Sequence, residues 1–158
     1  MQLAKLPILL LLLFVFGVKV SAQDRYLDQV FTQASKTTAL YGSNFTFLPL
    51  LQGGHFTRQP LQMQVYTPVG DTETARPLII YLHTGNFFPY PANGSCGGLL
   101  TDSANVAFAT QLAKMGYVVA VADYRLGWNP FSTQELIRRF TLINAAYRGV
   151  QDERTCIR

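Results

Sequence analysis

The chain has 158 residues, 49% of them hydrophobic, and a formal net charge of +4. Two of the basic residues, Lys5 and Lys19, lie in the first 22 residues. Residues 23–158 alone carry 11 basic and 9 acidic side chains, a net charge of +2. So small a charge without a clustered basic face gives no support for a nucleic-acid partner, and we expect none.

The first 22 residues have the layout of a secretory signal peptide. Lys5 supplies a positive charge, Ile8 to Phe16 is an unbroken apolar run, and Val20-Ser21-Ala22 places compact residues before a cleavage point. The run is well short of the roughly 20 apolar residues that span a bilayer. We therefore expect cleavage before Gln23, a secreted or periplasmic protein, and no stable membrane anchor.

Two strands are expected in the first part of the mature region. Residues 37–41 form a short apolar run that ends at the turn-forming segment 42–44. In residues 61–66, apolar and polar side chains alternate, which is typical of a half-exposed strand.

A strand, a loop, a helix and another strand follow. Residues 78–82 are continuously apolar, as in a strand buried on both faces. A helix is predicted over 103–115, with Asp102 as N-cap and Gly116 in the left-handed position after its end. Residues 117–122 form the next apolar strand, so the order predicts a parallel pair joined by a crossover helix.

The last segment reads as a long helix. Ser132 and Glu135 have the spacing of a capping box. Apolar residues then recur three and four positions apart, which predicts a stripe that lies on the sheet. The residues at this spacing are Leu136, Phe140, Ile143, Tyr147, Val150, Arg154 and Ile157.

The segment from His83 to Phe87, directly after the first apolar strand, is the one that points to chemistry. Ester hydrolysis passes through a tetrahedral oxyanion that backbone N–H groups can stabilise. A loop that does this needs glycine where the backbone approaches the ligand, and the imidazole of His83 would hold the loop. The alternative is a glycine-containing loop with a purely structural histidine.

Three segments resemble the α/β-hydrolase superfamily, especially its secreted carboxylesterase-like and lipase-like members. Residues 83–87 are similar to the HGGG-type oxyanion loop, residues 116–126 to the "GY-V-V…DYRL" strand and turn, and residues 146–154 to the "A…QD-R" helix. The resemblance implies the amino-terminal half of an α/β-hydrolase fold: a mainly parallel sheet flanked by helices, with an antiparallel N-terminal strand region. Residues 23–158 would then be a partial domain.

The resemblance also implies the roles of the loop residues. The N–H groups of Gly85 and Asn86 would form the oxyanion hole, with His83 supporting the loop. Thr84 and Asn86 replace family glycines, although Asn tolerates left-handed backbone better than most residues. The family's G-x-S-x-G nucleophile motif does not occur in the sequence. No catalytic residue is therefore assigned, and the triad is expected beyond Arg158.

The remaining polar and sulfur-containing residues give weaker predictions. Cys96 and Cys156 either form a disulfide, worth about 4 kcal/mol for a loop of this length, or stay as two thiols. No Cys/His spacing indicates a metal site, and no cofactor is expected. Asp123, Arg125, Asp152 and Arg154 are interpreted as structural groups that fix loops and helix ends.

Three interpretations of function stay open. The first is an N-terminal fragment of a secreted hydrolase acting on carboxylic esters, inactive alone, whose full-length form would take a small-molecule ester. The second is a secreted non-catalytic binding module on an α/β-hydrolase scaffold, since fold alone does not fix function. The third is a complete small α/β protein.

Overall fold

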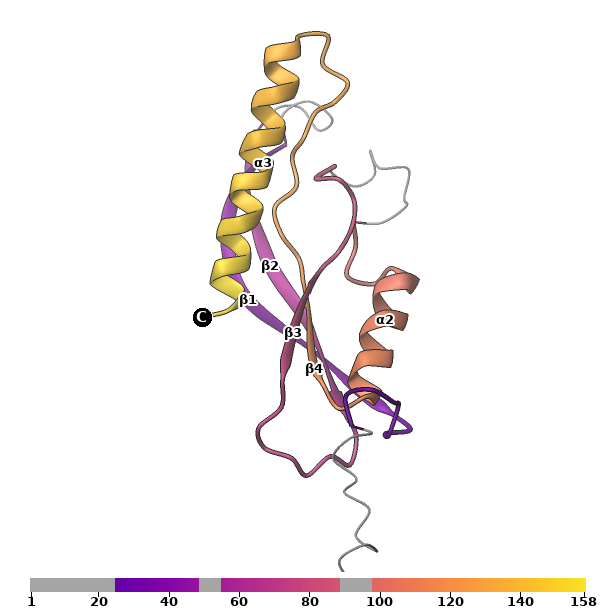
Figure 1. The fold of residues 1–158 in the computed structure, drawn as a ribbon. Helices are drawn as coiled ribbons and strands as arrows, with labels where there is room; N and C mark the ends of the chain where they lie inside the picture. The colour runs from indigo at the N-terminus through magenta and orange to yellow at the C-terminus, as the bar shows by residue number, and fades with distance from the viewer. Residues whose placement is uncertain (1–24, 49–54, 89–97) are drawn as a thin grey trace, which may run out of the picture.

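A computed structural model describes residues 25–48, 55–88 and 98–158, which form a four-stranded mixed sheet and two helices (Figure 1). The strand order across the sheet is β1-β2-β4-β3. The elements are β1 (Ala34–Leu48), β2 (His55–Pro68), β3 (Leu78–Leu82), α2 (Ser103–Lys114), β4 (Val118–Ala122) and α3 (Glu135–Cys156). The expected signal peptide and Cys96 lie outside the described residues.

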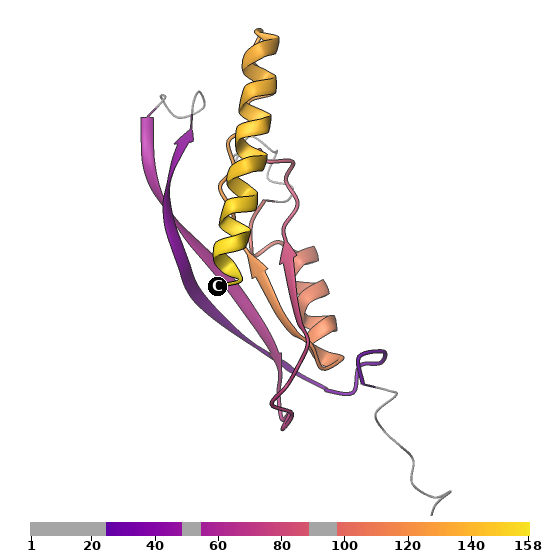
Figure 2. The same ribbon diagram turned by 60° about the vertical axis from the view of Figure 1, so that its left-hand side comes forward.

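β1 and β2 form a long antiparallel hairpin that runs along one side of the molecule (Figure 2). The expected turn at residues 42–44 is wrong, because β1 continues through them. The pairing register shifts between Leu40 and Gly42, which marks a bulge. A bulge re-aims a side chain without ending a strand. Here Tyr41 donates its hydroxyl hydrogen to the carbonyl oxygen of Asp123, at the end of β4.

The predicted parallel pair is confirmed: β3 and β4 pair in parallel from Leu78↔Val118 to Leu82↔Ala122, and α2 connects them. The sheet as a whole is not mainly parallel. Between described strands, β1 with β2 and β2 with β4 are antiparallel, because the long hairpin supplies half of the strands. The "mainly parallel" part of the prediction is therefore wrong, and the antiparallel N-terminal region is larger than expected.

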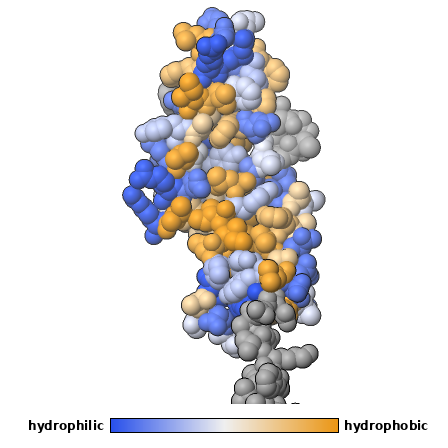
Figure 3. Space-filling model, in the orientation of Figure 1, coloured by the Kyte–Doolittle hydropathy of each residue, from blue (hydrophilic) through white to orange (hydrophobic). Residues whose placement is uncertain are grey.

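β3 lies at the edge of the sheet and is not buried on both faces. Its side chains are half-buried or exposed, and Leu78 is 56% exposed, whereas β4 is almost wholly buried between β2 and β3. Figure 3 shows hydrophobic surface over the middle of the molecule, where β3 lies in Figure 1. Sequence cannot separate a central from an edge strand here, because both are continuously apolar.

α2 covers one face of the sheet and closes the core. It begins at Ser103 after Asp102, as predicted, although the Asp102 carboxylate accepts the N–H of Leu99 and not a helix N–H. Gly116 has φ +106° and donates its N–H to the carbonyl oxygen of Ala113 (2.9 Å), which confirms the left-handed end. The buried core between this helix and the sheet consists of Tyr66, Ala109, Ala113, Val119 and Val121.

α3 packs with the face opposite to the predicted one. Its buried residues are Ala145, Gly149 and Asp152, whereas the apolar stripe is exposed. The prediction that the stripe lies on the sheet is therefore wrong. The helix starts at Glu135 with Gln134 as N-cap, and Ser132 accepts the N–H of Gln134. The predicted capping box does not form.

An ion pair helps to fasten the residues that precede β1. Two guanidinium nitrogens of Arg25 lie 3.0 and 2.6 Å from the two carboxylate oxygens of Asp71, in the turn between β2 and β3. The Asp71 side chain is 2% exposed. Hydrogen bonds from Arg25 hold the pKa of this carboxyl below its ordinary value. The folded chain therefore binds the Asp71 proton more weakly than the unfolded chain does.

We expect this ion pair to make the free energy of unfolding depend on pH in the acid range. A depressed folded pKa contributes stability above the unfolded value of about 3.9, and this stability is lost as the pH falls through the folded value. Urea unfolding between pH 7 and about pH 3 should show a smaller loss of unfolding free energy for Asp71→Asn than for the unaltered chain. Glu73→Gln, in the same turn, is the control and should keep the original dependence. Equal pH dependence of all three proteins would contradict this prediction.

Candidate functional site

The register of the parallel strands brings His83 and Asp123 together. Because Leu82 pairs with Ala122, the next residue of each strand leaves the sheet at the same edge. The Nε2 atom of His83 lies 3.3 Å from the Oδ1 atom of Asp123, and its Nδ1 atom lies 2.7 Å from the carbonyl oxygen of Thr84. Both ring nitrogens thus have a polar partner, so the imidazole is held on two sides.

Tyr124 fixes His83 from a third side. Its hydroxyl donates to the carbonyl oxygen of His83 (2.8 Å), and the two rings stack with centroids 4.5 Å apart. Burial, together with the charge of Asp123, raises the pKa of Tyr124 to about 12. The phenol therefore keeps its proton at neutral pH and remains a donor. His83 is only 2% exposed, so these contacts hold the backbone from which the next loop starts.

The loop after His83 has three successive residues with positive φ. These are Gly85 (129°), Asn86 (51°) and Phe87 (61°), and the N–H of Phe88 closes the turn on the carbonyl oxygen of Gly85 (2.8 Å). Glycine and asparagine accept such conformations easily, but a bulky phenylalanine there is strained. Strain of this kind persists only where the surrounding structure imposes it.

Phe87 is held by the loop that follows β4 and by α3. Its carbonyl oxygen accepts the N–H groups of Gly127 (2.9 Å) and Trp128 (3.0 Å). Its ring meets that of Tyr124 edge-on, with centroids 5.8 Å apart. Gly149 of α3 faces both rings, and a Cβ atom added there would lie 3.5 Å from each. A small residue at this helix position lets α3 approach the loop.

The contacts of Phe87 and Gly149 were not predicted from the sequence. An isolated glycine inside a helical pattern was the available signal, because it often marks close packing. His83, Gly85 and Asn86 lie in one short segment at the carboxyl end of β3, because they are close together in the sequence. Their assignment to an oxyanion hole stays a prediction.

Successive backbone N–H groups in such a turn form a concavity suited to an anion. Among the hydrogen bonds between described residues, none is donated by the N–H of Gly85 or Asn86. Asn86 is exposed and Gly85 half-buried, so the loop is reachable from solvent. The arrangement can therefore offer fixed N–H donors to a negatively charged oxygen.

A buried ion pair ties the loop after β4 to α3. The Nε atom of Arg125 lies 2.8 and 3.0 Å from the carboxylate oxygens of Asp152, which also accept the backbone N–H of Arg125 (3.0 Å). Asp152 is fully buried, and Arg125 also donates to the carbonyl oxygen of Phe45 in β1 (3.1 Å). These contacts agree with the interpretation of both residues as structural. The sequence did not indicate that they would be each other's partners.

Cys156 lies at the end of α3, with its Sγ atom 3.6 Å from the Sδ atom of Met63. Burial raises the pKa of its thiol. Since Cys96 lies outside the described residues, the Cys96–Cys156 disulfide stays a prediction. Within residues 25–48, 55–88 and 98–158, no group of three or more His, Cys, Asp or Glu could hold a metal ion. The same part of the chain has no helix long and apolar enough to cross a membrane.

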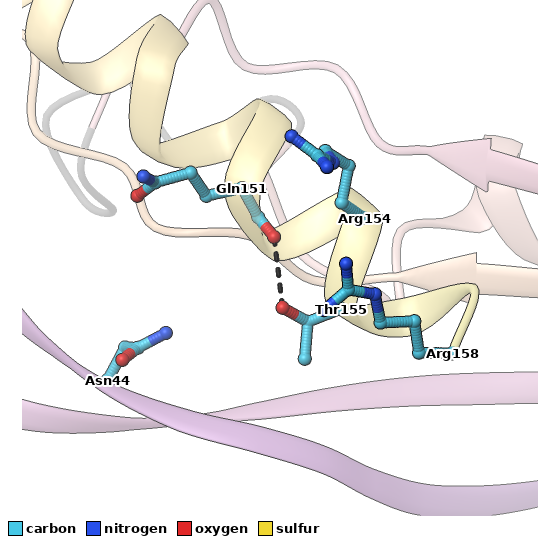
Figure 4. A pocket seen from close by; sticks show the side chains of 5 residues that line it. All are labelled: Asn44, Gln151, Arg154, Thr155 and Arg158. Atoms are coloured by element: carbon cyan, nitrogen blue, oxygen red, sulfur yellow. Dashed lines mark hydrogen bonds between the residues drawn. The ribbon is translucent and has the colours of Figure 1, made fainter.

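A cavity of about 370 Å³ lies between β1 and the carboxyl end of α3 (Figure 4). Asn44 lines it from β1, and four residues line it from the helix end: Gln151, Arg154, Thr155 and Arg158. Thr155 donates its hydroxyl hydrogen to the carbonyl oxygen of Gln151 (3.0 Å). None of these residues is among the predicted site residues.

Comparisons with known proteins do not assign the chain to a family. No family model matches the sequence, and no curated protein matches it. Among solved structures, the chain is similar to a brefeldin A esterase, a bacterial homologue of human hormone-sensitive lipase, with 19% identity and a TM-score of 0.37. That match covers 87% of this chain and 30% of the esterase chain. A likeness this low supports no conclusion about fold or activity.

Removing the acid of the buried ion pair should destabilise the fold strongly. Asp152→Asn leaves the Arg125 guanidinium buried without a counter-charge, which costs about 3–5 kcal/mol of unfolding free energy. Urea denaturation measures the loss, and Glu153→Gln on the same helix turn is the control. Replacing both partners by apolar residues (Arg125→Met with Asp152→Leu) should cost less than Asp152→Asn alone. A cost below about 1 kcal/mol for Asp152→Asn would show that the ion pair does not hold α3 to the loop after β4.

Proposed function

We propose that this chain is the amino-terminal part of a secreted α/β-hydrolase that acts on carboxylic esters, and that the loop after β3 supplies its oxyanion hole. The observation that carries the proposal is the positive φ of Gly85 and Asn86 at the carboxyl end of a parallel strand. The three sequence segments that resemble the superfamily support the choice of reaction.

The chemistry requires donors that are fixed before the reaction begins. Attack on an ester carbonyl places negative charge on the carbonyl oxygen, and each N–H aimed at it can be worth about 3 kcal/mol in the transition state. In our proposal Gly85 and Asn86 provide these groups. The contacts of His83 on one side and of Phe87 on the other hold the loop, so little reorganisation is needed.

In our proposal the groups that take part in catalysis come from different parts of a longer chain. The nucleophile, the acid and the catalytic histidine would lie beyond Arg158, and this chain would contribute the oxyanion hole. Without a nucleophile, an enzyme of this type retains only weak residual acceleration. The signal-peptide layout of residues 1–22 supports the secreted part of the proposal.

An anion titration followed by NMR tests the oxyanion loop itself. Diethyl phosphate, a tetrahedral monoanion, should shift the amide signals of Gly85 and Asn86 in a saturable way. Asn86→Gly keeps both the N–H and the left-handed backbone and should bind as well as the unaltered chain. Asn86→Asp keeps the N–H but adds a negative charge, which should weaken binding by about tenfold. Equal binding by the Asp variant, or no shift at Gly85, would overturn the assignment.

Activity and gene structure test the rest of the proposal. The purified chain should hydrolyse p-nitrophenyl acetate no faster than buffer does, and clear turnover would contradict the absence of a nucleophile. The reading frame past codon 158 should encode G-x-S-x-G, then an acidic residue and a histidine. A continuation with that serine replaced would point instead to a non-catalytic binding module.

A further inference from the structure

Two peptide units carry the donors of the proposed oxyanion hole. The N–H of Gly85 belongs to the peptide that begins with the carbonyl group of Thr84, and the N–H of Asn86 belongs to the next peptide. In a planar trans peptide, the carbonyl oxygen and the N–H point in opposite directions. The contacts that hold the two carbonyl oxygens therefore set the directions in which the two N–H groups point.

The two carbonyl oxygens are held in different ways. That of Gly85 accepts the N–H of Phe88 (2.8 Å), a contact within the turn itself. That of Thr84 lies 2.7 Å from the Nδ1 atom of His83, directly after β3. A carbonyl oxygen can only accept, so Nδ1 is the donor in this contact. The direction of the Asn86 N–H thus depends on the turn, whereas that of the Gly85 N–H depends on the His83 ring.

Asp123 lies on the other side of the His83 ring. The residues that follow the parallel strands β3 and β4 lie side by side (Figure 1). The Oδ1 atom of Asp123 is 3.3 Å from the Nε2 atom of His83. The same oxygen accepts the backbone N–H of Tyr124 (2.9 Å), which fixes the direction of the carboxylate. The His83 side chain has no exposed surface, so the ring has little freedom to turn away from these partners.

The backbone of Asp123 is fastened to the long hairpin. Its N–H donates to the carbonyl oxygen of Gln62 in β2 (2.9 Å), and its carbonyl oxygen accepts the hydroxyl hydrogen of Tyr41 in β1. Burial raises the pKa of Tyr41 above its ordinary value, so the phenol keeps its proton at neutral pH and stays a donor. The position of the Asp123 carboxylate is therefore set by β1, β2 and β4 and not by the loop that it helps to hold.

We propose that Asp123 is a positioning residue of the oxyanion loop, which acts through the His83 ring to set the direction of the Gly85 N–H. Its contact at Nε2 restricts rotation of the ring, so that Nδ1 stays beside the carbonyl oxygen of Thr84. A peptide next to glycine turns at little steric cost, so this peptide needs an external restraint. The inference rests on the proposed function for its catalytic meaning.

A direct effect of the Asp123 charge on a bound anion would have the opposite sign. A carboxylate near the loop repels an anion, so removal of its charge alone would tighten anion binding. Loss of the Gly85 donor weakens binding, because a hydrogen bond to a charged group is lost. The direction of the change in affinity therefore separates a positioning residue from a nearby charge.

Residual dipolar couplings of the unliganded chain report the direction of each N–H and need no anion. Asp123→Ala should change the coupling of Gly85 and leave that of Asn86, whose peptide is held within the turn. Asp123→Asn should keep both couplings, because its amide offers Nε2 a donor as well as an acceptor. Glu73→Ala is the matched control, since it also removes a carboxylate that accepts backbone N–H groups, but in the turn before β3.

Titration with diethyl phosphate measures the consequence for binding. Asp123→Ala should raise the dissociation constant about tenfold, whereas Asp123→Asn should bind at least as tightly as the unaltered chain. In a His83→Leu background, Asp123→Ala should weaken binding no further, because the ring through which it acts is gone. Circular dichroism should show the same secondary structure in the Asp123 variants and in the unaltered chain.

Three outcomes would overturn the proposal. The first is an unchanged Gly85 coupling in Asp123→Ala. The second is an equal change at Gly85 and Asn86, which would mean that the whole loop has loosened. The third is tighter binding of diethyl phosphate by Asp123→Ala, which would show an effect of charge alone. If the unaltered chain binds no anion, the proposed function fails, and the dipolar couplings still decide whether Asp123 sets the direction of the Gly85 N–H.

Discussion

The buried Arg125–Asp152 pair is the interaction on which the rest of the arrangement depends. It joins the loop after β4 to the inner face of α3, and through the Phe45 carbonyl oxygen it also reaches β1. A buried ion pair adds little net stability, because desolvation offsets most of the attraction. What this pair fixes is orientation: with Asp152 inside, α3 must turn its small residues inward and its apolar stripe outward.

The same orientation determines the geometry of the candidate oxyanion loop. With α3 in place, Gly149 lies against Phe87 and Tyr124, and the loop after β4 donates two N–H groups to the carbonyl oxygen of Phe87. These contacts keep Phe87 in a backbone conformation that it would not adopt alone. Asn86 and Gly85, one and two residues earlier, are consequently held with their N–H groups in a fixed direction. The site thus depends on a contact that is distant in sequence.

Local patterns predicted the parts of the fold that depend on neighbouring residues. Gly116 ends α2 with positive φ, and the β3–α2–β4 unit pairs in parallel, because strand–helix–strand order and turn chemistry are local signals. Gly42-Ser43-Asn44 fits a turn as well as a bulge, so the sequence alone does not separate the two at Tyr41. The segment from His83 to Asn86 was found from its residues, but the contacts that hold it were not, because Asp123, Gly127 and Gly149 reach it only in the folded chain.

The error in the facing of α3 has a specific physical origin. Amphipathic periodicity identifies the most apolar side of a helix and assumes that this side meets the core. Here the inner side is made of Ala145, Gly149 and Asp152, which are poor in apolar area but allow close approach and supply an ion pair. An apolar replacement of that pair would remove the constraint that selects between the two faces. Without the pair, α3 loses the contact that holds its inner face against the loop after β4 and, through Gly149, against Phe87. One polar contact therefore links the shape of the loop after β3 to the outward facing of the apolar side of α3.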